Sequence, residues 1–186
     1  NHLQPNPAEN SVIRLILGGA RSGKSRQAEQ LALASGREVF YIATAQAHDD
    51  EMRQRIERHR GERPVHWQTV EEPLQLAATI LTLQAPDRCL LIDCLTLWVT
   101  NQLLDEADLQ AEREALCAAL ANARGEVILV SNETGMGVVP MGELSRRFSD
   151  EAGWLNQSVA ALADQVMLMV AGIPLTIKGP TLETGQ

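Results

Sequence analysis

A glycine-rich segment near the start of the chain constrains the fold more than any other feature of the sequence. Residues 18–25 read Gly-Gly-Ala-Arg-Ser-Gly-Lys-Ser, which fits the phosphate-binding pattern G-x-x-x-x-G-K-[ST]. An apolar run at 12–17 precedes the segment, and a stretch typical of a helix follows at 25–34. A loop in this position turns its backbone N–H groups around phosphate oxygens, and the N-terminus of the next helix adds a favourable dipole. The sequence therefore predicts a nucleotide-binding strand, loop and helix, with a plain glycine-rich turn as the alternative.

Strand-like and helix-like segments alternate along the rest of the chain. Apolar or β-branched runs predict strands at 38–43, 65–70, 89–94, 126–131 and 166–170. Helical patterns are found at 49–60, 73–83, 107–123 and 144–163. This alternation predicts a three-layer α/β domain with a mostly parallel central sheet, of the RecA-like type found among P-loop nucleotide-binding proteins. We expect one such domain over 12–178, between a flexible N-terminal tail at 1–11 and a C-terminal tail at 179–186.

The charge and cysteine content argue against several classes of protein. Lys and Arg number 16 against 24 Asp and Glu, and the net charge of −8 makes nucleic acid or an anionic membrane an improbable main partner. An anionic nucleotide must then be bound by a local basic site. Cys89, Cys94 and Cys117 have neither metal-ligand spacing nor the even number of a disulfide framework, so free thiols in a reducing cytoplasm are expected. No apolar stretch of the sequence is long enough to span a bilayer.

The ends of the expected strands carry the candidate binding residues, because ligands of parallel sheets bind beyond the carboxyl ends of the strands. Lys24 is expected to reach the outer phosphates of a nucleotide, and the Ser25 hydroxyl to hold Mg²⁺. Asp93 ends an apolar run and can hold the same metal opposite Ser25, or instead cap the helix that follows. The segment 132–140 contains two glycines and a proline, and the residues leave open whether its Asn132 and Glu133 contact a ligand or form a structural turn.

One histidine stands on a densely charged segment that we expect to be helical, 49–60. His59 shares a helical face there with Met52, Arg55 and Ile56. Neutral imidazole is a competent nucleophile toward phosphorus, but the residues alone favour an incidental histidine on a solvated helix. His48, just before the helix, is a second and weaker candidate.

Further short motifs follow the glycine-rich loop in a fixed order. They are Tyr-Ile-Ala-Thr at 41–44, Asp-Asp-Glu-Met at 49–52, Arg-Ile-x-x-His-Arg at 55–60, Arg63-Pro64, Trp67, Val-Thr-Asn at 99–101, Asn-Glu-x-Gly-x-Gly-Val-Val-Pro at 132–140, Arg147-Phe148, Asp150, Gly153, Asn156 and Gln157. With these motifs, residues 16–178 resemble the bifunctional adenosylcobinamide kinase / adenosylcobinamide-phosphate guanylyltransferase family of cobalamin biosynthesis.

This resemblance implies two reactions on one scaffold. ATP or GTP first phosphorylates the aminopropanol hydroxyl of adenosylcobinamide. GTP then transfers GMP to an enzyme histidine with release of pyrophosphate, and the GMP passes on to adenosylcobinamide phosphate to give adenosylcobinamide-GDP. The family histidine lies on the charged helix after the second strand, and His59 fits that place. The residues alone favour an incidental histidine at position 59, whereas the resemblance implies that His59 is the histidine that accepts GMP. His48 stays a second candidate for this role.

The resemblance also implies the site residues and the assembly. His59 and Lys24 are the expected catalytic residues, and Ser25 and Asp93 the expected Mg²⁺ ligands. The expected nucleotide contacts are Gly18, Gly19, Ala20, Arg21, Ser22, Gly23, Lys24, Ser25, Ala45, Gln46, Ala47, Arg60, Gly61, Glu62, Arg63, Glu71 and Asp93. The family implies a cytoplasmic homotrimer. Two other functions are conceivable, a P-loop kinase of small metabolites without guanylyl transfer and a nucleotide-dependent regulatory module.

Overall fold

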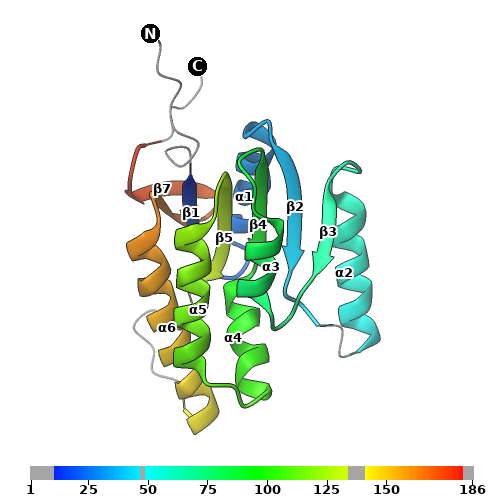
Figure 1. Ribbon diagram of the computed structural model, residues 1–186. Helices are drawn as coiled ribbons and strands as arrows, with labels where there is room; N and C mark the ends of the chain where they lie inside the picture. Colours follow the sequence, from blue (N-terminus) through cyan, green and yellow to red (C-terminus); the bar gives the residue numbers. More distant parts are fainter. Residues whose placement is uncertain (1–10, 47–48, 134–140, 182–186) are drawn as a thin grey trace.

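Seven strands form a single sheet in the part of the chain that the computed structural model describes, residues 11–46, 49–133 and 141–181. The strands are β1 (Val12–Gly18), β2 (Glu38–Ala43), β3 (Gln68–Glu71), β4 (Arg88–Asp93), β5 (Glu126–Asn132), β6 (Gln165–Val170) and β7 (Ile173–Lys178). Their order is β3-β2-β4-β5-β1-β6-β7, and all neighbouring pairs are parallel except β6 and β7 (Figure 1). The predicted α/β fold with a mostly parallel sheet is confirmed.

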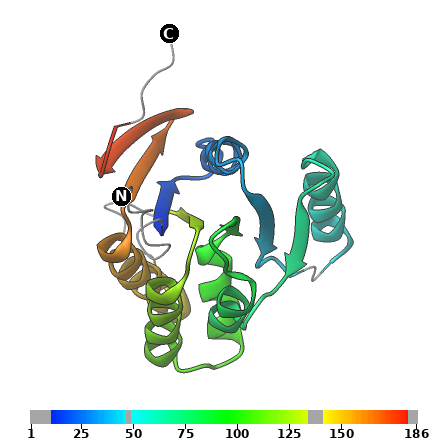
Figure 2. The same cartoon turned by 45° about the horizontal axis from the view of Figure 1, so that its top comes forward.

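Helices lie on both faces of the sheet and complete three layers. The helix α1 (Lys24–Ala34) covers one face (Figure 2). The opposite face is covered by α3 (Leu76–Leu83), α4 (Leu95–Leu104), α5 (Leu109–Asn122) and α6 (Glu143–Leu162). The charged helix α2 (Asp50–Glu62) lies beside the edge strand β3 (Figure 1). Asp49 caps its N-terminus, since the Asp49 carboxylate accepts the N–H of Met52 at 2.7 Å. None of the helices described is long and apolar enough to cross a membrane.

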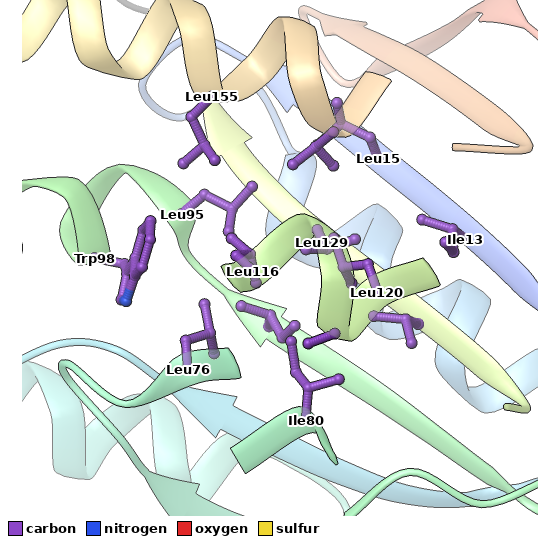
Figure 3. Packing of buried hydrophobic residues seen from close by; sticks show 14 of the residues in the cluster. Ile13, Leu15, Leu76, Ile80, Leu95, Trp98, Leu116, Leu120, Leu129 and Leu155 are labelled. Carbon is purple, nitrogen blue, oxygen red and sulfur yellow. The ribbon is translucent and has the colours of Figure 1, made fainter. Parts of the chain in front are cut away.

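Two apolar clusters, one on each face of the sheet, hold the layers together. Successive residues of a strand point to opposite faces, so Leu90 and Ile92 of β4 join one cluster while Leu91 joins the other. The larger cluster lies under α3 to α6, and Figure 3 shows part of its packing. Trp98 of α4 is completely buried there, and its indole N–H donates to the carbonyl oxygen of Leu74 at 3.0 Å. Each such large side chain contributes about 1.5–3 kcal/mol to folding by leaving water.

The register of the central strands brings four polar loops to one edge of the sheet. Ala43 of β2 is paired with Asp93 of β4, and Asp93 in turn with Val130 of β5. Gly18 of β1 is paired with Asn132 of β5. The carboxyl ends of β1, β2, β4 and β5 therefore meet, as expected for a parallel sheet, and the glycine-rich loop begins at this edge.

Two elements of the structure, a helix and a strand, were not predicted from the sequence. The helix α4 has seven buried residues, among them Thr96, Asn101 and Gln102, so it lacks the one-sided apolar pattern that identifies a surface helix. The strand β7 is mostly exposed and antiparallel to β6, and its Pro174 lies on the edge of the sheet, where proline is tolerated.

Two other elements are shorter than the sequence suggests. The strand expected at 65–70 begins only at Gln68, because the chain turns at 64–67 and the N–H of Trp67 donates to the Pro64 carbonyl oxygen at 3.1 Å. The helix expected at 73–83 begins only at Leu76, since the Glu72 carboxylate accepts the N–H groups of Leu74 and Gln75 and holds them in a turn.

Candidate active site

The glycine-rich loop joins β1 to α1 at the sheet edge. Gly23 precedes α1 with a φ of 93°, in the left-handed region that favours glycine. A side chain on Gly18 would clash with the hydroxyl of Ser22, whereas one on Gly19 would meet no atom within 4 Å. The Lys24 ammonium donates to the Gly19 carbonyl oxygen at 3.0 Å. This geometry is that of a phosphate-binding loop with its lysine lying over the loop.

The turn between β6 and β7 supports the loop from one side. The N–H of Gly172 donates to the Ser22 carbonyl oxygen at 2.9 Å, and a side chain on Gly23 would lie 3.3 Å from the Gly172 Cα. The Ser22 hydroxyl is buried and has no hydrogen-bond partner among the residues described. A buried polar atom of this kind is available to hydrogen-bond with a ligand or a water molecule. Because β7 was not predicted, this support could not be expected from the sequence.

Asp93 stands between the loop and β2. Its Oδ2 accepts hydrogen bonds from the Ser25 hydroxyl at 3.2 Å and from the Tyr41 phenol at 2.6 Å. Burial and the Asp93 charge both raise the pKa of Tyr41, so the phenol stays protonated and donates. Cys94, not Asp93, is the N-cap residue of α4, and no side chain among the residues described caps this helix, so Asp93 does not have the alternative role of a helix cap.

The donor set at Ser25 and Asp93 suits Mg²⁺. One carboxylate and one hydroxyl lie within hydrogen-bond distance of each other beside the phosphate loop. Mg²⁺ prefers oxygen ligands, keeps several waters and is usually bound by one or two protein groups together with phosphates. Among the described residues there is no cluster of three or more His, Cys, Asp or Glu side chains that could hold a metal by themselves. The residues therefore fit a metal that arrives with a nucleotide.

Arg63 is a buried, positively charged side chain that lines the same cavity as Asp93. Its guanidinium lies over the Tyr41 ring, 3.5 Å from the ring centroid, and donates to the Thr69 hydroxyl at 3.3 Å. Its Nε is buried without a hydrogen-bond partner among the residues described. Such a cation, 9% exposed and facing a cavity, is suited to an anionic ligand.

One cavity of about 260 Å³ joins these groups to the charged helix α2. Asp93 lines it from the end of β4 and Ser25 from the first turn of α1, while His59 and the C-cap residue Arg63 line it from α2. The helical face expected for His59 is confirmed, because Met52, Arg55 and Ile56 line the same cavity. The His59 side chain is 72% exposed, and its Nδ1 lies 3.9 Å from a carboxylate oxygen of Glu62. His59 is thus accessible from this cavity.

Glu29 is a lining residue that the sequence reading missed. It lies on α1, four residues after Ser25, and helical spacing places both on the same face. Burial raises the pKa of Glu29, the nearby Asp93 charge raises it further, and Arg63 and His59 lower it. The spacing from Ser25 is a signal that could have identified this residue.

A neighbouring pocket of about 260 Å³ gathers other predicted nucleotide contacts. Ala45, Arg60 and Glu71 line it, and the Arg60 guanidinium lies 3.9 Å from the Glu71 carboxylate. Ala45 lines both cavities and so joins the two. Gly61 and Glu62 are exposed at the end of α2, and Gln46 is half-buried. The predicted contact Ala47 and the candidate His48 lie outside the described residues.

A buried hydrogen-bond network fixes the strand ends around the site. The Thr44 hydroxyl accepts the N–H of Cys94 at 2.9 Å and donates to the Cys94 carbonyl oxygen at 2.7 Å. The Asn101 amide donates to the carbonyl oxygens of Thr44 at 2.8 Å and Pro73 at 3.1 Å. These contacts join β2 to α4 and hold the segments on both sides of Asp93.

The last motif loop is described only at its beginning. The N–H of Glu133 donates to the Gly18 carbonyl oxygen at 2.9 Å, and the N–H of Asn132 to the Thr96 hydroxyl at 2.8 Å. Residues 134–140 lie outside the described residues. Further along, Asn156 accepts the Ser131 hydroxyl at 2.6 Å, so this motif residue holds the end of β5 against α6.

Comparison with known proteins gives consistent matches over most of the chain. A family model described as cobinamide kinase / cobinamide phosphate guanyltransferase matches residues 14–177. The bifunctional adenosylcobalamin biosynthesis protein CobP of Pseudomonas aeruginosa is 61% identical over 170 residues, which cover 90% of this chain and 98% of that protein. The bifunctional adenosylcobalamin biosynthesis protein CobU of Escherichia coli is 45% identical over 182 residues, with 90% and 100% covered. Among solved structures, a RadB recombinase matches with a TM-score of 0.43 and 15% identity, over 84% of this chain and 73% of that one.

Proposed function

Because the chain belongs to the cobinamide kinase / cobinamide phosphate guanyltransferase family, we propose that its cavity at the sheet edge is the nucleotide site of both reactions. The chain is an enzyme of adenosylcobalamin biosynthesis with these two activities. It phosphorylates adenosylcobinamide with ATP or GTP, and then transfers GMP from GTP to adenosylcobinamide phosphate.

A single observation carries the proposal of a shared site. Ser25 and Asp93, which fit a metal–triphosphate complex, line the same cavity as His59. Ser25, the last residue of the glycine-rich loop, lines this cavity, so a triphosphate bound on the loop would lie beside the space that the imidazole faces. One bound nucleotide can therefore be attacked at the γ-phosphorus by an alcohol or at the α-phosphorus by the histidine.

Ser25 and Asp93 would hold Mg²⁺ on the triphosphate. The ion supplies charge neutralisation at the phosphate oxygens when it is bound. The remaining positive charge comes from this chain. Lys24 and Arg21 of the loop carry the charge needed to offset negative charge on the departing pyrophosphate.

The guanylyl step uses His59 as a nucleophile. The imidazole nitrogen forms a bond to the α-phosphorus of GTP, and the bond from that phosphorus to the α,β-bridging oxygen breaks, with the electron pair leaving on pyrophosphate. The phosphate oxygen of adenosylcobinamide phosphate then displaces the imidazole at the same phosphorus. Arg63, buried at the wall of the cavity, is suited to steady the GMP phosphate.

The neighbouring pocket is a suitable place for the rest of the nucleotide. Glu71 and Arg60 lie there, and both carry groups that hydrogen-bond to a base or a ribose. Their side chains are 59% and 61% exposed, so both are accessible to a ligand. We assign guanine or its ribose to this pocket, next to the shared Ala45.

Incubation with GTP labelled at the α-phosphate tests the covalent step. The wild-type protein is expected to keep label that is lost in acid and stable in alkali, as a phosphoramidate requires. His59→Ala should abolish the labelling, whereas His66→Ala, which removes an exposed histidine in the turn before β3, should leave it unchanged. Undiminished label in His59→Ala would overturn the assignment, and mapping the adduct by mass spectrometry would show whether His48 carries it.

The same experiment separates the alternative functions. A small-metabolite kinase without guanylyl transfer would phosphorylate the alcohol and form no adduct, and a regulatory module would bind nucleotide and form no corrinoid product. The homotrimer and the cytoplasmic location remain predictions from the family resemblance.

A further inference from the structure

Two carboxylates line the cavity that holds the candidate triphosphate site, and they differ in their bonding. The Asp93 Oδ2 accepts hydrogen bonds from both Ser25 and Tyr41, so this side chain is held against the phosphate loop. Glu29 makes neither a hydrogen bond nor an ion pair with any residue in the described ranges, although it is half-buried. Asp93 is therefore engaged in the structure, and Glu29 is available to a ligand.

The position of Glu29 relates it to the phosphates. One helical turn separates Glu29 from Ser25, so its carboxylate follows the Ser25 hydroxyl along the face of α1 that borders the cavity. Asp93 faces Glu29 from the end of β4, and His59, Glu62 and Arg63 face it from α2 and its C-cap. The Glu29 carboxylate and the Ser25 hydroxyl therefore border the same cavity, which an acceptor molecule would enter to reach a nucleotide on the loop.

We propose that Glu29 is the general base of the kinase reaction, the group that receives the proton of the attacking cobinamide alcohol. The alcohol oxygen forms a bond to the γ-phosphorus, and the bond from this phosphorus to the β,γ-bridging oxygen breaks with its electron pair leaving on the nucleoside diphosphate. The alcohol proton passes to the Glu29 carboxylate and from there to solvent. This assignment rests on the proposed kinase function of the same site.

The chemical character of the cavity agrees with this role. Burial makes the Glu29 carboxylate a stronger base than an exposed glutamate, while the Arg63 charge favours its ionised form. The other groups facing the cavity have different tasks, since His59 is the nucleophile of the guanylyl step and Arg63 is a permanent cation. The attack on the α-phosphorus by neutral imidazole needs no proton acceptor at Glu29, so the two reactions differ in their need for this residue.

Single-turnover phosphorylation of adenosylcobinamide by GTP and Mg²⁺, measured in the full chain, tests the proposal. General bases contribute about 100-fold or more to such rates, so Glu29→Gln should lower the phosphorylation rate constant by at least about 100-fold. The GTP concentration for half-maximal rate should change by less than about three-fold, because Glu29 does not hold the nucleotide. Labelling of the protein by α-labelled GTP should persist, and Glu29→Asp should restore part of the phosphorylation rate.

The matched control is Glu114→Gln, which removes an exposed carboxylate on α5, on the opposite face of the sheet. It should phosphorylate at the wild-type rate. A Glu29→Gln variant within about three-fold of the wild-type rate would overturn the proposal, and so would an equal loss of phosphorylation and labelling, which indicates a structural or nucleotide-binding role. Wild-type protein that phosphorylates no cobinamide would instead refute the proposed kinase function itself.

Discussion

The phenol of Tyr41 donates a 2.6 Å hydrogen bond to the Oδ2 atom of Asp93, the same atom that accepts from Ser25. The strand β2 thereby orients a carboxylate at the end of β4. Since Arg63 stacks on the Tyr41 ring, one aromatic side chain positions both the candidate metal ligand and the buried cation. The Tyr41 hydroxyl contacts Asp93 and the ring contacts Arg63, so a substitution that removes only the hydroxyl tests the first contact without the second.

Tyr41→Phe removes the hydroxyl and keeps the ring under Arg63. A hydrogen bond to a charged group contributes about 1.5–3 kcal/mol, so Asp93 should lose part of its orientation while the fold persists. We expect the Mg²⁺ concentration for half-maximal guanylyl labelling to rise several-fold. Titration of the wild-type protein and of Tyr41→Phe with Mg²⁺ measures this change. An unchanged Mg²⁺ dependence would show that Tyr41 does not orient a metal ligand.

The glycines of the phosphate loop should respond differently to substitution. Gly23→Ala places a side chain at a φ of 93° and close to the Gly172 backbone, and the left-handed conformation costs about 1–2 kcal/mol for other residues. Gly19→Ala meets no atom within 4 Å. Thermal unfolding of the nucleotide-free proteins should therefore show a lower Tm for Gly23→Ala and an almost unchanged Tm for Gly19→Ala. Equal Tm values would mean that the turn between β6 and β7 adjusts to the added side chain.

The phosphate loop and the strand ends were predictable because their signals are local. The pattern at 18–25 combines glycines with a lysine and a serine at fixed spacing, and short apolar runs bound by polar residues identify the central strands. The supporting contacts are not local. The Asn101 amide donates to the Thr44 carbonyl oxygen, 57 positions away in the sequence. The family resemblance included the motifs at 41–44 and 99–101 that contain these residues, but it did not indicate that the two motifs contact each other.

Other features lacked a pattern altogether. The helix α4 is apolar on most sides, so no face distinguishes it from a buried strand, and β7 depends on the neighbouring β6 for its place in the sheet. Glu29 is one of 24 acidic residues in the sequence; its spacing from Ser25 places it on the same helical face, but only the structure shows that this face borders a cavity.

The Asn101 network should be essential for stability. Asn101→Ala leaves the carbonyl oxygens of Thr44 and Pro73 without this donor, and each unsatisfied buried group costs about 1–3 kcal/mol. We expect the free energy of unfolding in urea to fall by about 2–4 kcal/mol. Asn122→Ala is the matched control, since its amide donates to the Ala118 carbonyl oxygen on an exposed helix end, and it should change stability by less than about 0.5 kcal/mol. Similar losses in the two variants would contradict the structural role of Asn101.

Glu29 should make the fold less stable as the pH rises. Because burial raises its pKa in the folded state, the folded chain holds this proton more tightly than the unfolded chain does. The contribution of Glu29 to stability is therefore fully present below its unfolded pKa of about 4.3 and is lost as the pH rises through the higher folded value. Glu29→Gln stays neutral, so it should match the wild-type stability at low pH and exceed it at neutral pH. Urea unfolding of both proteins across this range measures the difference. A stability difference between the two proteins that does not vary with pH would show that the Glu29 carboxylate is not held in a destabilising environment. If the difference instead grows with pH as expected, the chain tolerates a less stable fold in order to keep a charged group in the cavity.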